Sequence, residues 1–325
     1  MGLLSKINRT VCNIKKSYKS DKEFSKEFAR NNLYCSIAGL LKQNKVVAKR
    51  NKIKNEFVVD YLTNIYFDVI EKFKNDDFQG DNISDAPIWV CWWTGEETAP
   101  DIVKQCIKSI RKNAGNHTVN IITKQNYSQY LDIPEYILEK VNDGRMCVAN
   151  FSDYLRFSLL AKYGGLWIDA TIFCSREISP EFFEKPVFTC KYYSENSSCI
   201  SASRWTTFCI GGWKGNVFFR FMQEAFECYW QKEDYAIDYL LVDYTIYMAY
   251  CYVSTFKDSI DSLKNNNVHR NELAKAMVEG KPAEYFDLVI NPETVFYKLS
   301  WREKYPLLTN NGEKSVYAYF LEKKI

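Results

Sequence analysis

The chain has 325 residues, with 43 Lys and Arg against 40 Asp and Glu, a formal net charge of +3, and 46% hydrophobic residues. This composition excludes a disordered chain and indicates a folded protein with one large domain or two smaller ones. The eleven cysteines include no C-x-x-C pair and there are only two histidines, which argues against a disulfide framework, a His-rich metal site and a His-based triad. We see no signal peptide and no apolar run long enough to cross a bilayer.

Positive charge is concentrated at the start of the chain. Residues 1–54 carry 14 Lys and Arg and three acids, a local charge of +11, so the remainder carries −8. Apolar residues at helical spacing predict basic helices here and an amphipathic helix over residues 57–73. The polar, turn-rich residues 74–86 predict a linker. We therefore expect a basic helical segment at residues 1–84 and a main domain at residues 85–325.

The basic segment is open to more than one interpretation. It is consistent with a solvated helical face, and equally with attraction to anionic lipid headgroups, which contributes roughly 1 kcal/mol per basic residue near the surface. No recognised nucleic-acid-binding motif accompanies the charge, so we expect no nucleic-acid partner.

The main domain opens with the pattern of an α/β protein. Residues 87–95 (P-I-W-V-C-W-W-T-G) predict a buried strand that ends in a Thr-Gly turn, followed by a helix at residues 99–112 and a strand at residues 119–123. This order predicts a parallel pair with a right-handed crossover. The absence of G-x-G-x-x-G and Walker sequences leaves dinucleotide and P-loop sites without support.

The stretch over residues 150–172 combines a helix with a strand. Ser152 has the chemistry of an N-cap, and Gly164-Gly165 predicts the end of the helix. The apolar residues 166–168 predict a short strand closed by Asp169. A carboxylate at the C-terminal end of a buried strand lies where open α/β sheets bind ligands.

This stretch also carries a multi-residue pattern. Asp153-x-x-Arg156 followed by Tyr163-Gly164-Gly165-x-Trp167-x-Asp169 resembles the core motif of sugar-nucleotide glycosyltransferases of the GT-A fold. Those enzymes include the bacterial capsular polysaccharide synthesis glycosyltransferases, the large clostridial toxin glucosyltransferases and the yeast initiating mannosyltransferases. The resemblance implies a Rossmann-like mixed sheet flanked by helices, and transfer of a hexose from a UDP-sugar with retention of configuration.

The resemblance also implies roles for individual residues. Asp153 and Arg156 would contact the ribose and the donor sugar or phosphate, and Trp167 would lie alongside the nucleotide. Asp169 would meet the ribose or a divalent metal, and Trp92 would stack on the uracil. From the residues alone, a structural Asp153–Arg156 ion pair and core packing of Trp92 are the alternatives.

One position departs from the family pattern. The second acid of the D-x-D motif is Thr171 here, a weaker ligand than a carboxylate for Mn²⁺ or Mg²⁺. We therefore expect Asp169 as the metal ligand, with only weak help from Thr171. Lys298 stands where yeast-type relatives often have a histidine, and we expect it to supply part of the metal's positive charge. The alternative is a lysine on an edge strand.

The residues after Lys298 complete the expected donor site. By resemblance, Ser300 would contact a phosphate oxygen and Trp301 would lie over the nucleotide. Residues 235–244 predict the start of an apolar helix that carries Asp243. Buried acids are unfavourable unless paired or functional, so Asp243 either contacts the donor sugar or acceptor or pairs with a Lys or Arg. With Asp169 and Arg156 it makes up the expected catalytic group.

These observations predict a glycosyltransferase that acts on a glycan acceptor, with a lipid-linked repeat unit of a capsule or exopolysaccharide as the expected acceptor. Such an enzyme would lie in the cytoplasm, peripherally on the inner face of the cell membrane. A protein-modifying glycosyltransferase is one alternative. A sugar-nucleotide-binding protein without transfer activity is the other, because Thr171 weakens the metal site.

Overall fold

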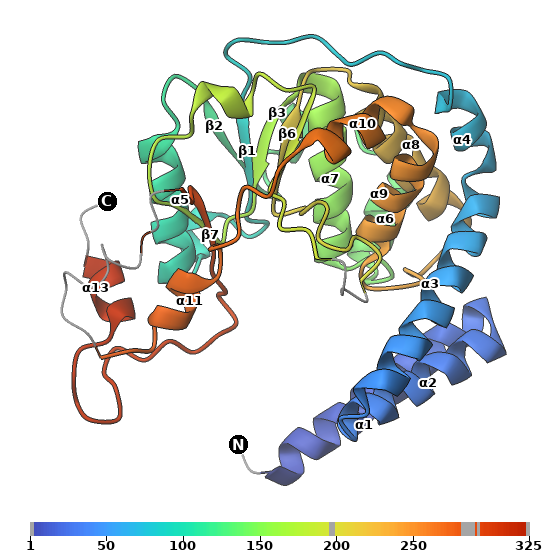
Figure 1. The fold of residues 1–325 in the computed structure, drawn as a ribbon, viewed down its shortest axis with the longest axis horizontal. Coiled ribbons are helices and arrows are strands. Elements are labelled where there is room, and N and C mark those ends of the chain that lie inside the picture. The colour runs from blue at the N-terminus through green and yellow to red at the C-terminus, as the bar shows by residue number, and fades with distance from the viewer. Residues whose placement is uncertain (1–2, 195–198, 281–289, 291–292, 323–325) are drawn as a thin grey trace.

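The computed structural model describes residues 3–194, 199–280, 290 and 293–322. Its centre is a five-stranded sheet of order β2-β1-β3-β6-β5, in which β1 runs parallel to β2 and β3, and β6 runs antiparallel to β3 and β5 (Figure 1). A second, antiparallel sheet pairs β4 with β7. The strands are β1 Ile88–Cys91, β2 Val119–Ile122, β3 Gly165–Ile168, β4 Ile172–Cys174, β5 Val187–Thr189, β6 Cys209–Gly212 and β7 Phe296–Lys298. The predicted mixed α/β fold and the parallel β1–β2 pair are confirmed.

Helices cover both faces of the sheet (Figure 1). On one face lie α6 Glu135–Asn142, α7 Val148–Tyr163, α8 Val217–Lys232, α9 Leu241–Tyr252 and α10 Ser254–Ser262. On the other lie α5 Asp101–Asn113, α11 Glu272–Ala276 and α13 Val316–Glu322. The short 3-10 helices are η1 Glu96–Thr98, η2 Tyr127–Gln129 and η3 Pro180–Phe182.

Strand alternation divides the interior into two cores. In β3, Trp167 packs into the core with α7 and α8, while Leu166 and Ile168 pack into the core with α5. In β1, Trp89 and Ile88 divide in the same way. Successive strand residues point to opposite faces, so the near-continuous apolar strands reflect burial on both sides.

The N-terminal helices form an arm at the lower right of Figure 1. It comprises α1 Leu3–Phe24, α2 Lys26–Leu40 and α3 Asn44–Ile65, followed by α4 Phe67–Phe73. The Ser25 hydroxyl caps α2 by accepting from the amides of Glu27 and Phe28. Further along, Leu62 of α3 and Phe73 of α4 enter the core that α8 and α9 share. The domain boundary at residue 84 stays a prediction. No helix within the described residues is long and apolar enough to cross a bilayer.

The glycine pair after α7 explains how the chain enters β3. Gly164 has a φ of +68°, and its amide caps α7 by donating to the Leu160 carbonyl. Gly165 has a φ of +97°, and a Cβ there would lie 2.0 Å from the Pro87 carbonyl oxygen. Only glycine permits this backbone conformation together with so close an approach of the two backbone segments.

Two predicted helix starts are wrong. Helix α7 begins at Val148, so Ser152 lies inside the helix and does not cap it. Helix α9 begins at Leu241 rather than near residue 235. The Asp238 carboxylate accepts from the Leu240 amide, an Asx-type turn that competes with helix immediately before α9.

Candidate functional site

Asp169 directly follows β3, at the C-terminal ends of the parallel strands β1 and β3. Its Oδ1 accepts from Trp167 Nε1 at 2.9 Å and from Arg156 Nη2 at 3.3 Å, and its Oδ2 accepts from Lys298 Nζ at 2.9 Å. The side chain is 28% exposed. Asp169 is therefore held in place by three donors while remaining reachable from solvent.

Arg156 connects Asp169 to the interior of α7. Its Nη1 donates to Asp153 Oδ1 at 2.5 Å, and its guanidinium lies 4.8 Å from the centre of the Trp167 ring. The side chain is only 5% exposed, and its Nε has no hydrogen-bond partner among the described residues. The Asp153–Arg156 ion pair, which was the structural alternative for these residues, is present and extends to Asp169, while their roles in donor binding stay a prediction.

Lys298 reaches the site from a distant part of the chain. Strand β7 pairs with β4 so that Lys298 lies opposite Ile172, one residue after Thr171. The ammonium donates to Thr171 Oγ1 at 3.1 Å as well as to Asp169 Oδ2. It thus joins the two side chains that occupy the D-x-D positions.

The local charges set the ionisation of these acids. Burial alone would raise the pKa of Asp169, but the charges of Lys298 and Arg156 outweigh it and lower the pKa to about 2. Burial dominates for Asp153 and raises its pKa to about 6, although Arg156 acts in the opposite direction. Asp169 is consequently ionised at neutral pH, while Asp153 titrates closer to neutrality.

Asp243 lies in the first turn of α9 and accepts from Trp205 Nε1 at 2.9 Å. Burial raises the pKa of Asp243 to about 6, and the charges of Asp153 and Arg156 both act on it. Asp243 therefore belongs to the same electrostatic group as the α7 pair. Its polar partner is a tryptophan, where pairing with Lys or Arg was the structural alternative.

Two tryptophans lie together at the predicted nucleotide site. Trp92, just after β1, and Trp301, three residues beyond β7, make an edge-to-face contact with ring centroids 5.8 Å apart. Trp301 is 47% exposed, and Trp92 Nε1 is buried without a partner among the described residues. Ser300 Oγ accepts from the Arg302 amide at 3.3 Å. The structure thus brings together residues more than two hundred positions apart in the sequence.

The side chains around Asp169 do not fit a divalent metal well. The described residues contain no group of three or more His, Cys, Asp or Glu side chains that could hold a metal ion. Asp169 Oδ2 and Thr171 Oγ1, the oxygens expected to bind Mn²⁺ or Mg²⁺, share the Lys298 ammonium instead. Hard divalent cations require several oxygen ligands, and an adjacent ammonium opposes their binding.

Comparison with known proteins identifies the family of this chain. Residues 39–320 match the family described as capsular polysaccharide synthesis protein. This chain belongs to that family. It is also 31% identical over 104 residues to the O-glycosyltransferase braB of Annulohypoxylon truncatum, a match that covers 29% of this chain and 25% of the relative. The chain thus aligns with about a quarter of the curated relative's length. No solved structure gives a significant match.

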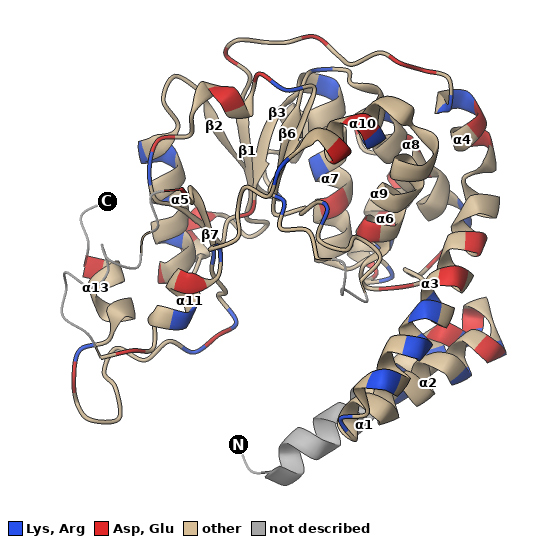
Figure 2. Ribbon diagram, viewed as in Figure 1, with Lys and Arg blue, Asp and Glu red and all other residues tan. Residues whose placement is uncertain are grey.

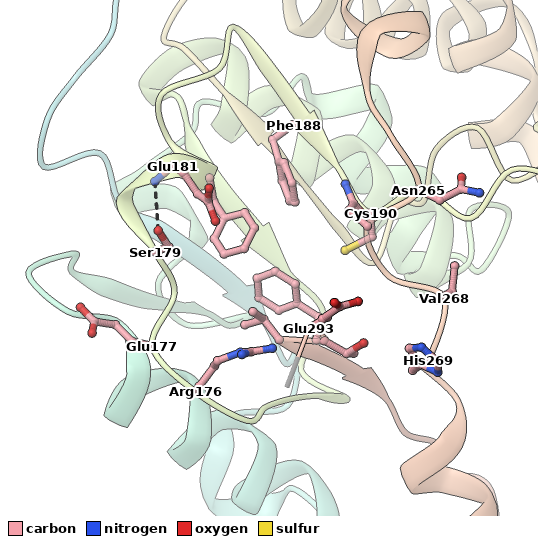
Figure 3. A pocket seen from close by; sticks show the side chains of 15 residues that line it. Arg176, Glu177, Ser179, Glu181, Phe188, Cys190, Asn265, Val268, His269 and Glu293 are labelled. Atoms are coloured by element: carbon pink, nitrogen blue, oxygen red, sulfur yellow. Dashed lines mark hydrogen bonds between the residues drawn. The ribbon is translucent and has the colours of Figure 1, made fainter. Parts of the chain in front are cut away.

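A cavity of about 450 Å³ lies beside β7 in this family member (Figure 3). Phe182, Phe188 and Phe296 form its apolar side, with ring centroids 4.8 Å and 5.3 Å apart for the two pairs that include Phe182. Figure 3 shows Glu293 and His269 at the polar side. Phe296 lines this cavity, and Lys298 lies two residues further along β7 on the same face of the strand, but neither Lys298 nor Asp169 lines the cavity.

One residue of the candidate site of this capsular polysaccharide synthesis protein could not be predicted from the sequence. The sequence of residues 205–212 predicts a strand, but β6 begins at Cys209, so Trp205, which donates to Asp243, lies before the strand. The signal for a further role is weak: a tryptophan follows a basic residue in an otherwise polar stretch. A nitrogen donor on a large apolar ring suits a half-buried carboxylate, but sequence spacing does not place the two together.

Proposed function

We propose that this protein is a glycosyltransferase that moves a hexose from a UDP-sugar to a glycan acceptor, specifically a lipid-linked repeat unit. The observation that carries the proposal is the ionised Asp169 at the C-terminal end of β3, held by Arg156, Trp167 and Lys298. Ligands bind at this edge of open α/β sheets. The name of the O-glycosyltransferase relative supports the reaction class, and the motif resemblance supports a UDP-sugar and retention.

The donor would enter with its uracil against the Trp92–Trp301 pair, where the exposed Trp301 ring offers a surface for stacking. Asp169 would accept a hydrogen bond from a ribose or sugar hydroxyl. Arg156 acts behind it, since its buried guanidinium holds the Asp169 carboxylate in one orientation. Ser300 would approach the diphosphate from the segment that carries Trp301.

Lys298 would stabilise the leaving group in this proposal. Transfer forms a bond between the acceptor oxygen and the anomeric carbon and breaks the bond from that carbon to the diphosphate, so negative charge develops on the departing UDP. The Lys298 ammonium, 34% exposed beside Asp169, is placed to meet that charge. The acceptor proton passes to a phosphate oxygen. The Mn²⁺ or Mg²⁺ dependence that the motif resemblance implies is untested, and because Lys298 bonds both candidate ligand oxygens we propose transfer without a divalent metal.

Asp243 is the proposed contact for the acceptor or the transferred sugar. Its carboxylate keeps one oxygen on Trp205 Nε1, and its second oxygen can accept from a sugar hydroxyl. Burial raises the pKa of Asp243 although Trp205 donates to the carboxylate, so this one bond compensates the ionised form only in part. A bound hydroxyl would supply a second bond.

The proposal is tested by measuring thermal shifts with a panel of UDP-, GDP- and CMP-sugars. We expect one or a few UDP-sugars to raise the melting temperature of the wild type, and the shift to be lost in Asp169→Asn. Asp261→Asn, which alters a surface acid paired with Lys257, is the matched control and should keep the shift. Failure of every UDP-sugar to bind would contradict the proposal.

A binding protein without transfer activity is the second candidate, because Thr171 replaces the second acid of the D-x-D motif and Lys298 bonds the oxygens that would bind a metal. It predicts the same nucleotide-sugar thermal shift with no release of UDP, even when acceptor glycans are supplied. Turnover that depends on Lys298 would eliminate it.

A further inference from the structure

The distal part of the N-terminal arm exposes a cluster of large apolar side chains. Leu40 and Leu41, at the turn between α2 and α3, are 59% and 63% exposed. We call the whole cluster the α2–α3 patch; it consists of Tyr34, Ile37, Leu40, Leu41, Val46 and Ile53. Single exposed apolar residues are ordinary, but a contiguous group of this kind marks an interaction surface.

The spacing of these residues makes the patch continuous across the two helices. Tyr34, Ile37 and Leu41 are three and four residues apart, so they follow one exposed stripe of α2. The Arg50 guanidinium of α3 lies 5.2 Å from the centre of the Tyr34 ring, which brings the two stripes together.

On α3, the patch continues on either side of that contact. Val46 and Ile53 are four residues before and three residues after Arg50, so all three lie on one face of the helix. Arg50 also donates to Asn31 Oδ1, and Asn31 Nδ2 donates to the Arg50 carbonyl, which fixes α2 against α3. The patch is therefore presented on a braced pair of helices.

The charge around the patch has a single sign. Residues 30–55 contain seven Lys and Arg and no Asp or Glu. Lys42, Lys45 and Lys49 are exposed next to the apolar side chains, and Figure 2 shows basic residues in successive turns of α3. A second copy of this surface would be repelled, whereas a surface of negative charge with an apolar layer beneath complements both features.

We propose that the α2–α3 patch docks onto an anionic lipid surface. The apolar side chains insert at the boundary between headgroups and acyl chains, and the surrounding lysines contact the phosphates, as in interfacial amphipathic helices. This inference deepens the proposed function by naming a surface on which a lipid-linked acceptor would lie, but its geometry does not depend on the donor site.

Vesicle flotation of the full chain tests the proposal, with phosphatidylcholine vesicles and vesicles that also contain phosphatidylglycerol. We expect wild type to float only with the anionic vesicles and to be released by salt. Lys42→Gln/Lys45→Gln/Lys49→Gln should lower the partition coefficient roughly 100-fold, since each basic residue contributes separately. Leu40→Asn/Leu41→Asn should lower binding without changing its salt dependence.

Lys15→Gln/Lys16→Gln/Lys19→Gln removes the same charge from α1 and is the matched control, which should retain most binding. Melting temperature and the UDP-sugar thermal shift are followed in every variant, so loss of lipid binding and loss of donor binding are separated. Undiminished flotation of Leu40→Asn/Leu41→Asn, equal loss in the α1 control, or no flotation of wild type would overturn the proposal. A dimer that dissociates on the leucine substitutions would overturn it too, by assigning the patch to a second copy.

Discussion

At the scale of single residues, the candidate site depends on the Lys298 ammonium, which hydrogen-bonds two side chains at once. The ammonium bonds Asp169 and Thr171 at 2.9 and 3.1 Å, so it occupies the position between the two side chains of the D-x-D pattern. With Arg156 it outweighs the effect of burial and lowers the pKa of Asp169 to about 2. One lysine thus keeps the carboxylate ionised and supplies a positive charge to the same edge of the sheet.

Lys298→Ala should reduce UDP release from the preferred UDP-sugar by roughly 100-fold or more, because a single donor to a developing negative charge contributes about that much. Lys257→Ala, which removes an exposed lysine paired with Asp261, should leave the rate unchanged. Steady-state turnover at saturating donor is the measurement. An unchanged rate in Lys298→Ala would rule out its role at the leaving group.

The double variant Thr171→Asp/Lys298→Ala tests whether a metal ion can take over the role of the Lys298 ammonium. It removes the ammonium and supplies a second carboxylate beside Asp169, so the pair gains the oxygen ligands that Mn²⁺ requires. We expect turnover that appears with Mn²⁺ and disappears in chelator, in contrast to the wild type. If wild-type turnover itself vanishes in chelator and returns with Mn²⁺, the proposed role of Lys298 is wrong.

Asp243→Asn should change the pH dependence of stability. Burial raises the Asp243 pKa from 3.8 to about 6, so the folded state holds this proton more tightly than the unfolded chain. Wild-type stability therefore falls as pH rises between these two values, by on the order of 3 kcal/mol at most. The amide cannot ionise, so the variant should be more stable than wild type at neutral pH, as measured by urea unfolding across this range.

The control variant Asp261→Asn should change the pH dependence of stability in the opposite direction. Burial acts to raise the pKa of Asp261, but its bonds with Lys257 and Tyr250 outweigh this and lower it. Asp261→Asn should therefore lose a little stability above the unfolded pKa. Equal pH profiles for wild type and Asp243→Asn would show that Asp243 is not held in an unfavourable environment.

The sequence could identify most of the residues around Asp169 but not all of the contacts between them. The spacing of Asp153, Arg156, Trp167 and Asp169 follows from one helix and one strand, and these residues do meet. The Lys298 contact depends on the pairing of β7 with β4, which no local pattern specifies. The roles assigned to these residues in binding a nucleotide sugar stay predictions.

At the scale of secondary structure, the Gly164-Gly165 turn sets the position of β3 and so of Asp169. The Gly164 carbonyl accepts from Trp89 Nε1 at 2.9 Å, and the Leu166 amide donates to the Pro87 carbonyl at 3.0 Å. Both bonds tie the turn to β1. The turn is predictable from the sequence because glycine is the residue that most readily adopts the left-handed backbone that ends a helix.

Gly165→Ala should destabilise the fold by about 3 kcal/mol or more, since its φ is +97° and the new Cβ would meet the Pro87 carbonyl at 2.0 Å. Gly39→Ala is the matched control: Gly39 is an exposed residue of α2 with no atom within 4 Å of the added Cβ. That variant should gain about 0.5–1 kcal/mol. Equal unfolding free energies for the two variants would contradict this role of the glycine pair.

The helix starts illustrate why element boundaries are harder to predict than elements. Ser152 has the right chemistry for a cap, yet buried Asn150 and Phe151 extend α7 backward past it. The sequence places Asp238 within a helix, but its side chain satisfies the backbone of a turn instead. In both cases the side chain has two local options, and tertiary packing selects between them.

At the scale of the whole molecule, the N-terminal segment is partly an arm and partly core. Tyr66 of the α3–α4 junction is fully buried and its hydroxyl shares a hydrogen bond with Thr245 Oγ1 of α9. Tyr244 donates to Asn55, and Lys54 pairs with Asp238 at 2.9 Å. Hydrophobic periodicity predicts the helices correctly, but periodicity alone does not reveal what an apolar face packs against.

Two deletions should separate the arm from the core. Removing residues 1–43 is expected to leave a folded protein that melts at a lower temperature, because α1 packs mainly on α2 and α2 packs mainly on α3. Removing residues 1–84 also strips six buried side chains from the shared core: Val58, Leu62, Tyr66, Val69, Ile70 and Phe73.

Burial of each such side chain contributes about 2 kcal/mol. The stability lost on removing residues 1–84 is therefore comparable with the whole stability of a domain. We therefore expect residues 85–325 alone to aggregate or unfold, as judged by size-exclusion chromatography and far-UV circular dichroism. A monodisperse product with cooperative melting would show instead that residues 85–325 form an independent domain.

Sugar transfer at the carboxyl end of β3 is the central proposal, and UDP release is the assay that tests it most directly. Wild type and Asp169→Asn are compared with the UDP-hexose that gives the largest thermal shift, with acceptor glycan present. We predict steady UDP release by wild type and a loss of at least roughly 100-fold in the variant, whose fold is verified by melting. Equal release by the two proteins would place the chemistry elsewhere, and no release by either would favour the binding protein.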